Sequence, residues 1–549
     1  MAKCLGLLSM LVLAALRGSG ADDQAIRKGL IYRPASGQFW DPSVIYVGGK
    51  YYMYSMYGGD SVWLATSKDG VHWADYGVVL KSEGFKNNRV WKPYVTKIGT
   101  KFILNHGAFT DQGTNNNLLR FYESQDLIHW KYLYEIPIDT NFYRSNGRWD
   151  HMYSIPKNEQ NPSQGSWGYM VADPIDHGGF GMMDSPDGVH FKPIQAPQIL
   201  ADFRIPTLEI GGIKKFGQKY YLLGGNVNHY GFSGYGVYTY LADSPTGPFR
   251  PDLDAYRLTG TSGIDGNYFV HVLACFVKDS PEDLVSDPFT FRNVSDTDGQ
   301  GTWFLPMRKA IVDAQGHLRL AYWRQNDLVK GKEIQIDTLE NSVLFPPGQT
   351  AANPIVQVSG GGNHLLIHTD KDWKQFSWLD AGRTRKAIAV LNHRFDLTSG
   401  LIIEGQINAK AVFHGYRDAS KSYAGFFIEG LEKDGVRKEG PEKGSGTGIL
   451  LEIGEPQWRE SLIGRIQTEG SFRFESLDAT GRASATVTGL DDGKDHTFRL
   501  WLRSGQMELY IDDLLMQSFF YSKATGRIGF LVQESEVDFS KLRFYSMNL

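Results

Sequence analysis

The chain has 549 residues, with 57 Lys and Arg against 61 Asp and Glu, 41% hydrophobic and 13% aromatic residues. This composition excludes a disordered chain, which cannot bury enough apolar surface to fold. A formal charge of -4 without a basic run gives no electrostatic footprint for nucleic acid or an anionic membrane, so neither is expected as a partner.

The first 21 residues have the features of a secretory signal rather than of a folded segment. Lys3 precedes an apolar run over residues 5–16, and small residues lead to Ala21, after which we expect cleavage. The run of about twelve residues is shorter than the roughly 20 of a membrane helix, and no later segment approaches that length. The sequence therefore predicts a secreted or periplasmic protein without membrane insertion. One of the two cysteines lies in this segment, and the other, Cys275, is interpreted as a buried apolar residue.

An internal repeat organises residues 30 to about 340. Four segments end in a similar turn followed by an aromatic residue: Ser67–Trp73, Ser124–Trp130, Ser185–Phe191 and Ser244–Phe249. Counted at equivalent turn positions, the segments follow one another at steps of 57, 61 and 59 residues. A near-constant step of this size indicates one unit of several strands repeated around an axis, as in a β-propeller.

Each unit also opens in a similar way, with a pair of strands around a tight turn. The openings begin at Trp40–Pro42, Trp91–Pro93, Trp149–His151, Thr207–Glu209 and Leu305–Arg308. Five openings predict a five-bladed β-propeller over residues 30–343, in which the first strand of every blade lines the central channel. The stretch from about Asp252 to Thr302 is longer than a simple connection, and we expect a surface insertion that walls the cleft.

Three of the five openings carry a carboxylate at the matching position: Asp41, Asp150 and Glu209. Taken singly, each would more often be a turn cap or a solvated surface group. Together they predict carboxylates that converge at one axial site, where like charges push one pKa up and leave another group ionised. Such a pair is what hydrolysis of a glycosidic bond needs. Trp40 and Trp149, next to two of them, could supply walls for a sugar.

The motifs quoted above resemble the five-bladed glycoside hydrolases of families 43 and 32. The Trp-Asp-Pro opening and the Glu209 strand with its Gly-Tyr-Tyr-Leu hairpin are similar to family 43. That resemblance implies Asp41 as the general base, Asp150 as the residue that orients the site and sets the pKa of the acid, and Glu209 as the general acid, with inversion at the anomeric carbon. A family 32 reading would make Asp41 the nucleophile, with retention.

The sequence departs from both families at particular positions. Family 32 usually has Asn before Asp-Pro and Cys after the acid, where this chain has Trp40 and Ile210. Family 43 often has a His in the fifth blade that helps to hold a central metal, where this chain has Arg308. We therefore expect no cofactor; a central structural cation stays an alternative, which the fifth-blade motif does not support. The predicted substrate-binding residues are Trp40, Trp91, Trp149, His151 and Arg308.

A second domain is predicted over residues 355–549. Pro- and Gly-rich segments at Phe345–Gly348 and Ser359–Gly362 punctuate the chain where the repeat ends. Alternating apolar residues from Thr497 to Ile511, and again around Phe530, indicate antiparallel strands in two packed sheets. This part resembles the concanavalin-type β-sandwich appended to both hydrolase families. Trp501 is interpreted as a core aromatic residue rather than as a sugar-binding one.

The sequence thus predicts an all-β protein, a five-bladed propeller followed by a concanavalin-like sandwich. Its predicted function is that of a secreted glycoside hydrolase that releases terminal sugars from oligo- or polysaccharides. The preferred mechanism inverts the configuration at the anomeric carbon. The alternatives are a retaining fructosidase of the family 32 type and a non-catalytic propeller that binds glycan. The sugar, the linkage and the oligomeric state stay open.

Overall fold

The computed structural model describes the chain from residue 30 onward with internal gaps. The described residues are 30–36, 40–82, 89–108, 117–161, 164–227, 235–260, 268–270, 274–292, 301–336, 343–345, 356–358, 363–368, 386–411, 422–430, 446–454, 461–467, 473–480, 484–485, 489–521 and 524–549. The predicted signal segment lies outside them. No helix in the described part of the chain is long and apolar enough to cross a membrane.

The first four blades are antiparallel sheets whose strands follow chain order, as predicted. Blade 1 contains β1 (Trp40–Val47), β2 (Lys50–Tyr57), β3 (Ser61–Ser67) and β4 (Ala74–Lys81), and blade 2 contains β5 (Trp91–Ile98), β6 (Lys101–Ala108), β7 (Leu118–Ser124) and β8 (Lys131–Pro137). Blade 3 contains β9 (Trp149–Pro156), β10 (Ser166–Ala172), β11 (Gly181–Ser185) and β12 (Lys192–Ile194). Blade 4 contains β13 (Glu209–Phe216), β14 (Lys219–Val227), β15 (Tyr235–Ala242), β16 (Arg250–Pro251) and β17 (Arg257–Gly260).

The fifth blade differs from the prediction in which strand lies innermost. Its strand order is β19 (Cys275–Phe276), β20 (Leu284–Ser286), β23 (Arg308–Val312) and β24 (Leu318–Tyr322). The opening predicted at Leu305–Arg308 therefore leads into the third strand, and the stretch expected to be a surface insertion supplies the two inner ones. Strands of two and three residues are too short to show an alternating pattern. The same stretch also forms a small sheet of β18 (Tyr268–Val270), β21 (Pro288–Arg292) and β22 (Gly301–Phe304).

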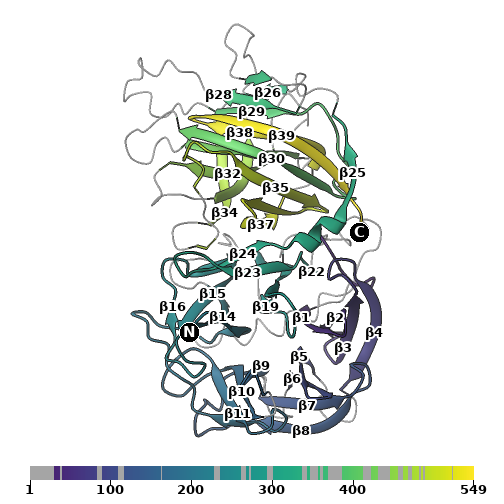
Figure 1. Ribbon diagram of the computed structural model, residues 1–549, viewed down its shortest axis with the longest axis vertical. Helices are drawn as coiled ribbons and strands as arrows, with labels where there is room; N and C mark the ends of the chain where they lie inside the picture. The colour runs from purple at the N-terminus through teal and green to yellow at the C-terminus, as the bar shows by residue number, and fades with distance from the viewer. Residues whose placement is uncertain are drawn as a thin grey trace.

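The inner strands pack in the order β1, β5, β9, β13 and β19, and the segment directly after β19 closes the ring onto β1. Blade 5 joins blade 1 just after β19, where Lys278 and Ile45 form a parallel bridge. The backbone N–H of Tyr46 donates to the Lys278 carbonyl at 2.9 Å, and that of Lys278 donates to the Val44 carbonyl at 2.9 Å. In Figure 1 the labels β1, β5, β9, β14 and β19 surround the centre of the lower body. The predicted five-bladed propeller is confirmed.

The Ser and Asp residues that mark the repeated turn in the sequence also stabilise it through hydrogen bonds. Ser67 Oγ accepts a hydrogen bond from the Gly70 N–H at 2.8 Å, and Asp69 Oδ1 accepts from the N–H groups of Val71 and His72. The turns of blades 2 and 3 repeat this pattern. The aromatic residue after the turn packs between neighbouring blades, as Trp130 does against Tyr54 at 5.9 Å between ring centroids.

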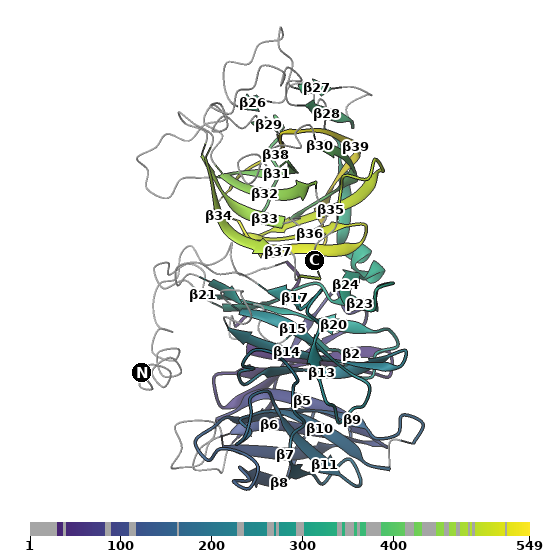
Figure 2. The ribbon, with the colours of Figure 1, turned by 90° about the vertical axis from the view of Figure 1, so that its left-hand side faces the viewer.

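The sandwich consists of two large sheets that lie on one edge of the propeller (Figure 2). One is formed by β27 (Val356–Val358), β28 (Leu365–His368), β39 (Ser535–Met547), β30 (Leu401–Ala411), β35 (His496–Arg503), β36 (Gln506–Ile511) and β37 (Leu514–Phe520). The other is formed by β26 (Val343–Phe345), β29 (Lys386–Val390), β38 (Ala524–Gln533), β31 (Ser422–Gly430), β32 (Gly446–Ile453), β33 (Ser461–Gln467) and β34 (Arg473–Thr480). β25 (Lys330–Ile334) pairs with β39, so strands that precede residue 355 also belong to the sandwich sheets.

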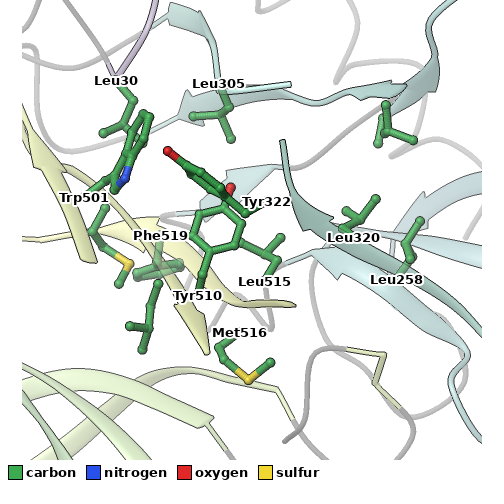
Figure 3. Packing of buried hydrophobic residues seen from close by; sticks show 14 of the residues in the cluster. Leu30, Leu258, Leu305, Leu320, Tyr322, Trp501, Tyr510, Leu515, Met516 and Phe519 are labelled. Atoms are coloured by element: carbon green, nitrogen blue, oxygen red, sulfur yellow. The ribbon is translucent and has the colours of Figure 1, made fainter. Parts of the chain in front are cut away.

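A shared apolar core joins the two domains where β24 meets β37, through the bridge of Ala321 and Leu514. Tyr322 packs edge-on against Tyr510 at 5.2 Å and against Trp501 at 6.0 Å, as Figure 3 shows. Trp501 is fully buried, which confirms its interpretation as a core residue. Because one core crosses the boundary, the sandwich and the fifth blade are held as one unit.

Candidate active site

The inner strands begin with backbone irregularities that turn their first side chains out of the regular pleat. Asp41 has a positive φ of 46°, and the register with β2 shifts between Trp40 and Ser43. Lys92 in blade 2 has a φ of 27°, with the same kind of shift between Trp91 and Tyr94. Bulges of this kind re-aim a side chain and bend the strand. The equivalent ends of β1, β5, β9 and β13 thus present one residue each at the same end of the channel.

Two of the three predicted carboxylates are joined by an arginine that the sequence analysis did not select. Arg148 Nη2 donates to Asp150 Oδ2 at 3.0 Å and to Glu209 Oε2 at 3.3 Å, and Nη1 donates to Glu209 Oε1. The side chain of Arg148 is 38% exposed, against 5% for Asp150 and 16% for Glu209. Arg148 is therefore the most exposed of the three side chains, and it bridges blades 3 and 4.

Asp41 belongs to the same cluster, because it interacts electrostatically with four other charged or titratable side chains from blades 2, 3 and 4. Burial is the largest influence and raises the pKa of Asp41. The Lys92 ammonium opposes this effect, the Glu209 carboxylate adds to it, and His151 and Asp150 act more weakly in opposite directions. The result is a pKa of about 6 for Asp41. The structure thus brings Asp41, Asp150 and Glu209 together at one end of the channel.

Asp150 is held ionised by its surroundings. Burial acts to raise its pKa, but the hydrogen bonds from His151 and the charge of Arg148 outweigh burial and leave the pKa below its ordinary value. The backbone N–H of His151 donates to Asp150 Oδ1 at 2.8 Å. Gly107 on β6 leaves room for this carboxylate, since a Cβ at position 107 would lie 2.3 Å from Oδ1. Asp150 is therefore a fixed negative charge beside the other two carboxylates.

His151 supports the carboxylate cluster from within the protein, because its side chain is buried. Its side chain is 1% exposed, its Nε2 donates to the Ile210 carbonyl at 3.1 Å, and its ring stacks on Tyr94 with centroids 5.5 Å apart. The prediction that His151 binds substrate is corrected on this ground. The residue instead ties β9 to β13 directly behind Asp150.

Trp149 and Arg308 also lie outside the carboxylate cluster. Side chains alternate along a strand, so Asp150 faces the channel and its neighbour Trp149 faces the core. Trp149 is fully buried, and its Nε1 donates to the Ile136 carbonyl at 3.1 Å. Arg308 lies on the third strand of blade 5, has no exposed surface, and forms ion pairs with Asp287 and with Glu508 of the sandwich. Both substrate-binding predictions are therefore corrected to structural roles.

Trp40 and Trp91 are half-buried at the starts of β1 and β5. Each directly precedes a residue of the charged cluster, Asp41 or Lys92, so both remain candidates for the walls of a pocket. Within the described residues, no three His, Cys, Asp or Glu side chains are grouped so that they could hold a metal ion.

Two functional candidates were missed, and each left a signal in the sequence. Arg148 precedes Asp150 by two positions, which is the spacing of residues on one face of a strand. Lys92 stands in a Trp-Lys-Pro segment that parallels the Trp-Asp-Pro segment around Asp41. It is 1% exposed, and its Nζ donates to Cys275 Sγ at 3.0 Å. The cluster thus contains two cations in addition to the three predicted carboxylates.

No family model and no curated protein matches the sequence. Solved structures do match, over nearly the whole chain. Sucrose-6-phosphate hydrolase from Lactobacillus gasseri has a TM-score of 0.61 at 12% identity, with 99% of this chain and 96% of that chain covered. The GH32 beta-fructofuranosidase BmSUC1 of Bombyx mori has a TM-score of 0.57 at 13% identity, covering 93% and 92%. Exo-inulinase from Aspergillus awamori has a TM-score of 0.57 at 12% identity, covering 96% and 99%. At this identity the likeness establishes the fold, a five-bladed propeller with an appended sandwich.

Proposed function

We propose that this protein is a glycoside hydrolase that removes terminal sugar units from oligo- or polysaccharides. The observation that carries the proposal is the convergence of Asp41, Asp150 and Glu209, from three separate blades, at one end of the propeller channel. Buried carboxylates repel one another and resist desolvation, so such a cluster is costly unless the chemistry uses it. The whole-chain likeness to a sucrose-6-phosphate hydrolase and an exo-inulinase supports the same class of reaction.

In the proposed reaction Glu209 donates a proton to the leaving glycosidic oxygen, and Asp41 acts on the opposite side of the anomeric carbon. Asp150, held ionised, binds sugar hydroxyl groups and stabilises the positive charge that develops on the ring. Arg148 contacts both oxygens of Glu209, so this contact must loosen for Glu209 to carry a proton to the leaving group. We propose that a substrate entering beside Arg148 displaces its guanidinium from Glu209, which frees the carboxyl group to carry the proton.

As the first candidate we place a retaining reaction on a β-fructofuranoside, with Asp41 as the nucleophile. The matches to fructan- and sucrose-cleaving enzymes span the propeller and the sandwich together, which supports this reading over the inverting one expected from the Trp-Asp-Pro motif. The inverting reaction, with Asp41 as general base, remains the second candidate, because a pKa of about 6 suits a base that works near neutral pH. From the predicted signal over residues 1–21 we place the substrate outside the cytoplasm.

The test is hydrolysis of sucrose, inulin-type fructan and a panel of aryl glycosides by the purified protein, followed by identification of the sugar released. Addition of methanol then separates the two mechanisms. A retaining enzyme passes the sugar from Asp41 to methanol and forms a methyl glycoside of the original configuration, whereas an inverting enzyme releases the inverted free sugar. Binding of a glycan without turnover of any substrate would instead support the non-catalytic propeller.

A further inference from the structure

Lys92 occupies in blade 2 the position that Asp41 occupies in blade 1. Both stand between a Trp and a Pro at the start of an inner strand, both have a positive φ, and both are followed by a shift in register with the next strand. A left-handed backbone is unusual for residues other than Gly and costs conformational energy. The same backbone irregularity therefore places the ammonium of Lys92 in blade 2 and the carboxylate of Asp41 in blade 1.

The Lys92 side chain reaches across the channel. Its Nζ donates to Cys275 Sγ at 3.0 Å, and Cys275 lies on β19, the innermost strand of blade 5. Blade 1 lies between blades 2 and 5 in the ring, since β1 packs against β5 and its Val44 and Tyr46 bond to Lys278 just after β19. The hydrogen bond therefore joins the two blades on either side of the one that carries Asp41. This explains how an ammonium of a neighbouring blade acts on that carboxylate.

The contacts of Lys92 do not neutralise its charge. The side chain is 1% exposed, a sulfur atom is a weak hydrogen-bond acceptor, and the ring of Tyr94 lies 5.4 Å from Nζ. A buried ammonium is costly to keep without a negative partner nearby. Among the charged side chains that act on Asp41, Lys92 has the largest effect in favour of the ionised carboxylate.

We propose that Lys92 is a positioning residue for the reaction, whose ammonium, anchored by Cys275 in blade 5, supports the carboxylate of Asp41 in the free enzyme. This inference rests on the proposed function, in which Asp41 acts as nucleophile or base. The groups that face Asp41 are Lys92 from β5, Asp150 and His151 from β9, and Glu209 from β13. The two carboxylates favour the protonated form of Asp41, and Lys92 is the strongest influence against it.

The channel contains a matched control in Lys278. This second lysine is also buried, with its Nζ donating to the Ser154 carbonyl at 2.6 Å and lying 4.5 Å from the ring centre of Tyr153. It is not among the main influences on the pKa of Asp41. Lys278→Met therefore shows the effect of losing a buried lysine. Lys92→Met shows the additional effect of losing the charge that acts on Asp41.

The experiment measures the acidic limb of the pH profile of kcat/KM, which reports the ionisation of the free enzyme. A nearby positive charge lowers the pKa of a carboxyl group, so Lys92→Met, which removes that charge, should move the limb to higher pH. Lys92→Arg, which keeps the charge, should move it less, and Lys278→Met should leave it in place. Folding of each variant is checked by circular dichroism and thermal unfolding. A folded Lys92→Met protein with the wild-type limb would overturn the proposal.

A second measurement does not depend on turnover. A water-soluble carbodiimide reacts with the protonated carboxyl group, and peptide mass spectrometry follows labelling of Asp41 as a function of pH. Labelling should persist to higher pH in Lys92→Met than in wild type and in Lys278→Met. The same pH dependence in all three proteins would contradict the role of Lys92. If the wild-type protein shows no hydrolase activity but labelling shifts as expected, the proposed function fails while the influence of Lys92 on Asp41 stands.

Discussion

Arg148 and Glu209 are joined through both oxygens of the carboxylate, across the boundary between blades 3 and 4. The same guanidinium also contacts Asp150, and it is the most exposed member of the three. A planar guanidinium can donate to two carboxylates at once with fixed geometry, which an ammonium cannot do. Arg148 therefore sets the spacing of the proposed acid and the fixed negative charge, and it does so where a substrate would enter.

Substitution of Arg148 should lower turnover strongly. We expect Arg148→Met to reduce kcat/KM by about 100-fold or more, because it leaves two carboxylates close together without the cation that organises them. Arg148→Lys should recover only part of the loss, since an ammonium does not reproduce the bidentate contact. Steady-state kinetics on the best substrate tests this, with Arg144→Met, an exposed arginine nearby, as the control. Wild-type kcat/KM in Arg148→Met would remove Arg148 from the site.

Glu209→Gln and Asp41→Asn should separate the two proposed catalytic roles. Both should lower kcat by at least about 100-fold, the lower bound for loss of a general acid or base. An aryl glycoside with a strongly acidic leaving group needs no proton donor, so it should restore much of the activity of Glu209→Gln but not that of Asp41→Asn. Glu123→Gln on blade 2, where Glu123 pairs with Lys101, serves as the control. Equal rescue of both variants would contradict the assignment of Glu209 as the acid.

The ionisation of Asp41 should link activity and stability to pH in opposite directions. Its pKa is about 6 in the folded protein against an ordinary value of 3.8, so the folded state binds the proton more tightly. The free energy of unfolding should therefore fall as pH rises from about 4 to about 6, while kcat/KM rises over the upper part of that range.

Asp41→Asn removes this dependence. Relative to wild type, the variant should gain stability between pH 4 and pH 7 by less than about 3 kcal/mol, the value that two pKa units would give for a fully buried group. Urea unfolding at the two pH values measures the difference. A gain that is the same at pH 4 and pH 7 would show that the charge of Asp41 is not its cause.

The buried ion pair of Arg308 and Glu508 should stabilise the junction of propeller and sandwich. Both side chains have no exposed surface, and Asp287 and Tyr510 complete the network. Removal of one partner leaves an uncompensated buried charge, so Arg308→Met should lower the free energy of unfolding by about 3 to 5 kcal/mol. The double variant Arg308→Met with Glu508→Gln should lose less than the sum of the two single variants.

Chemical denaturation of the four proteins measures this coupling. A stable Arg308→Met protein whose KM rises selectively would restore the sugar-binding role that the sequence suggested for Arg308.

The sequence determined the repeat and, through it, the meeting of distant residues. Blades share one register, so carboxylates at equivalent positions of three repeats had to approach one axis, and Asp41, Asp150 and Glu209 do so. The alternation of residues 497–511 likewise specified the sandwich strands, because a period of two is a local property of the chain.

Only the tertiary structure decided what each side chain touches. The inner strand of blade 5 is too short to show a pattern, so its place in the ring became visible only through its bonds to blade 1. Arg308 was therefore assigned to the channel, although it lies on the third strand and meets Glu508, 200 residues away. The hydrogen bond between Lys92 and Cys275 joins residues 183 positions apart, and the sequence around neither residue predicts it. Contacts between blades depend on ring closure, which is a property of the whole fold and not of any one stretch of sequence.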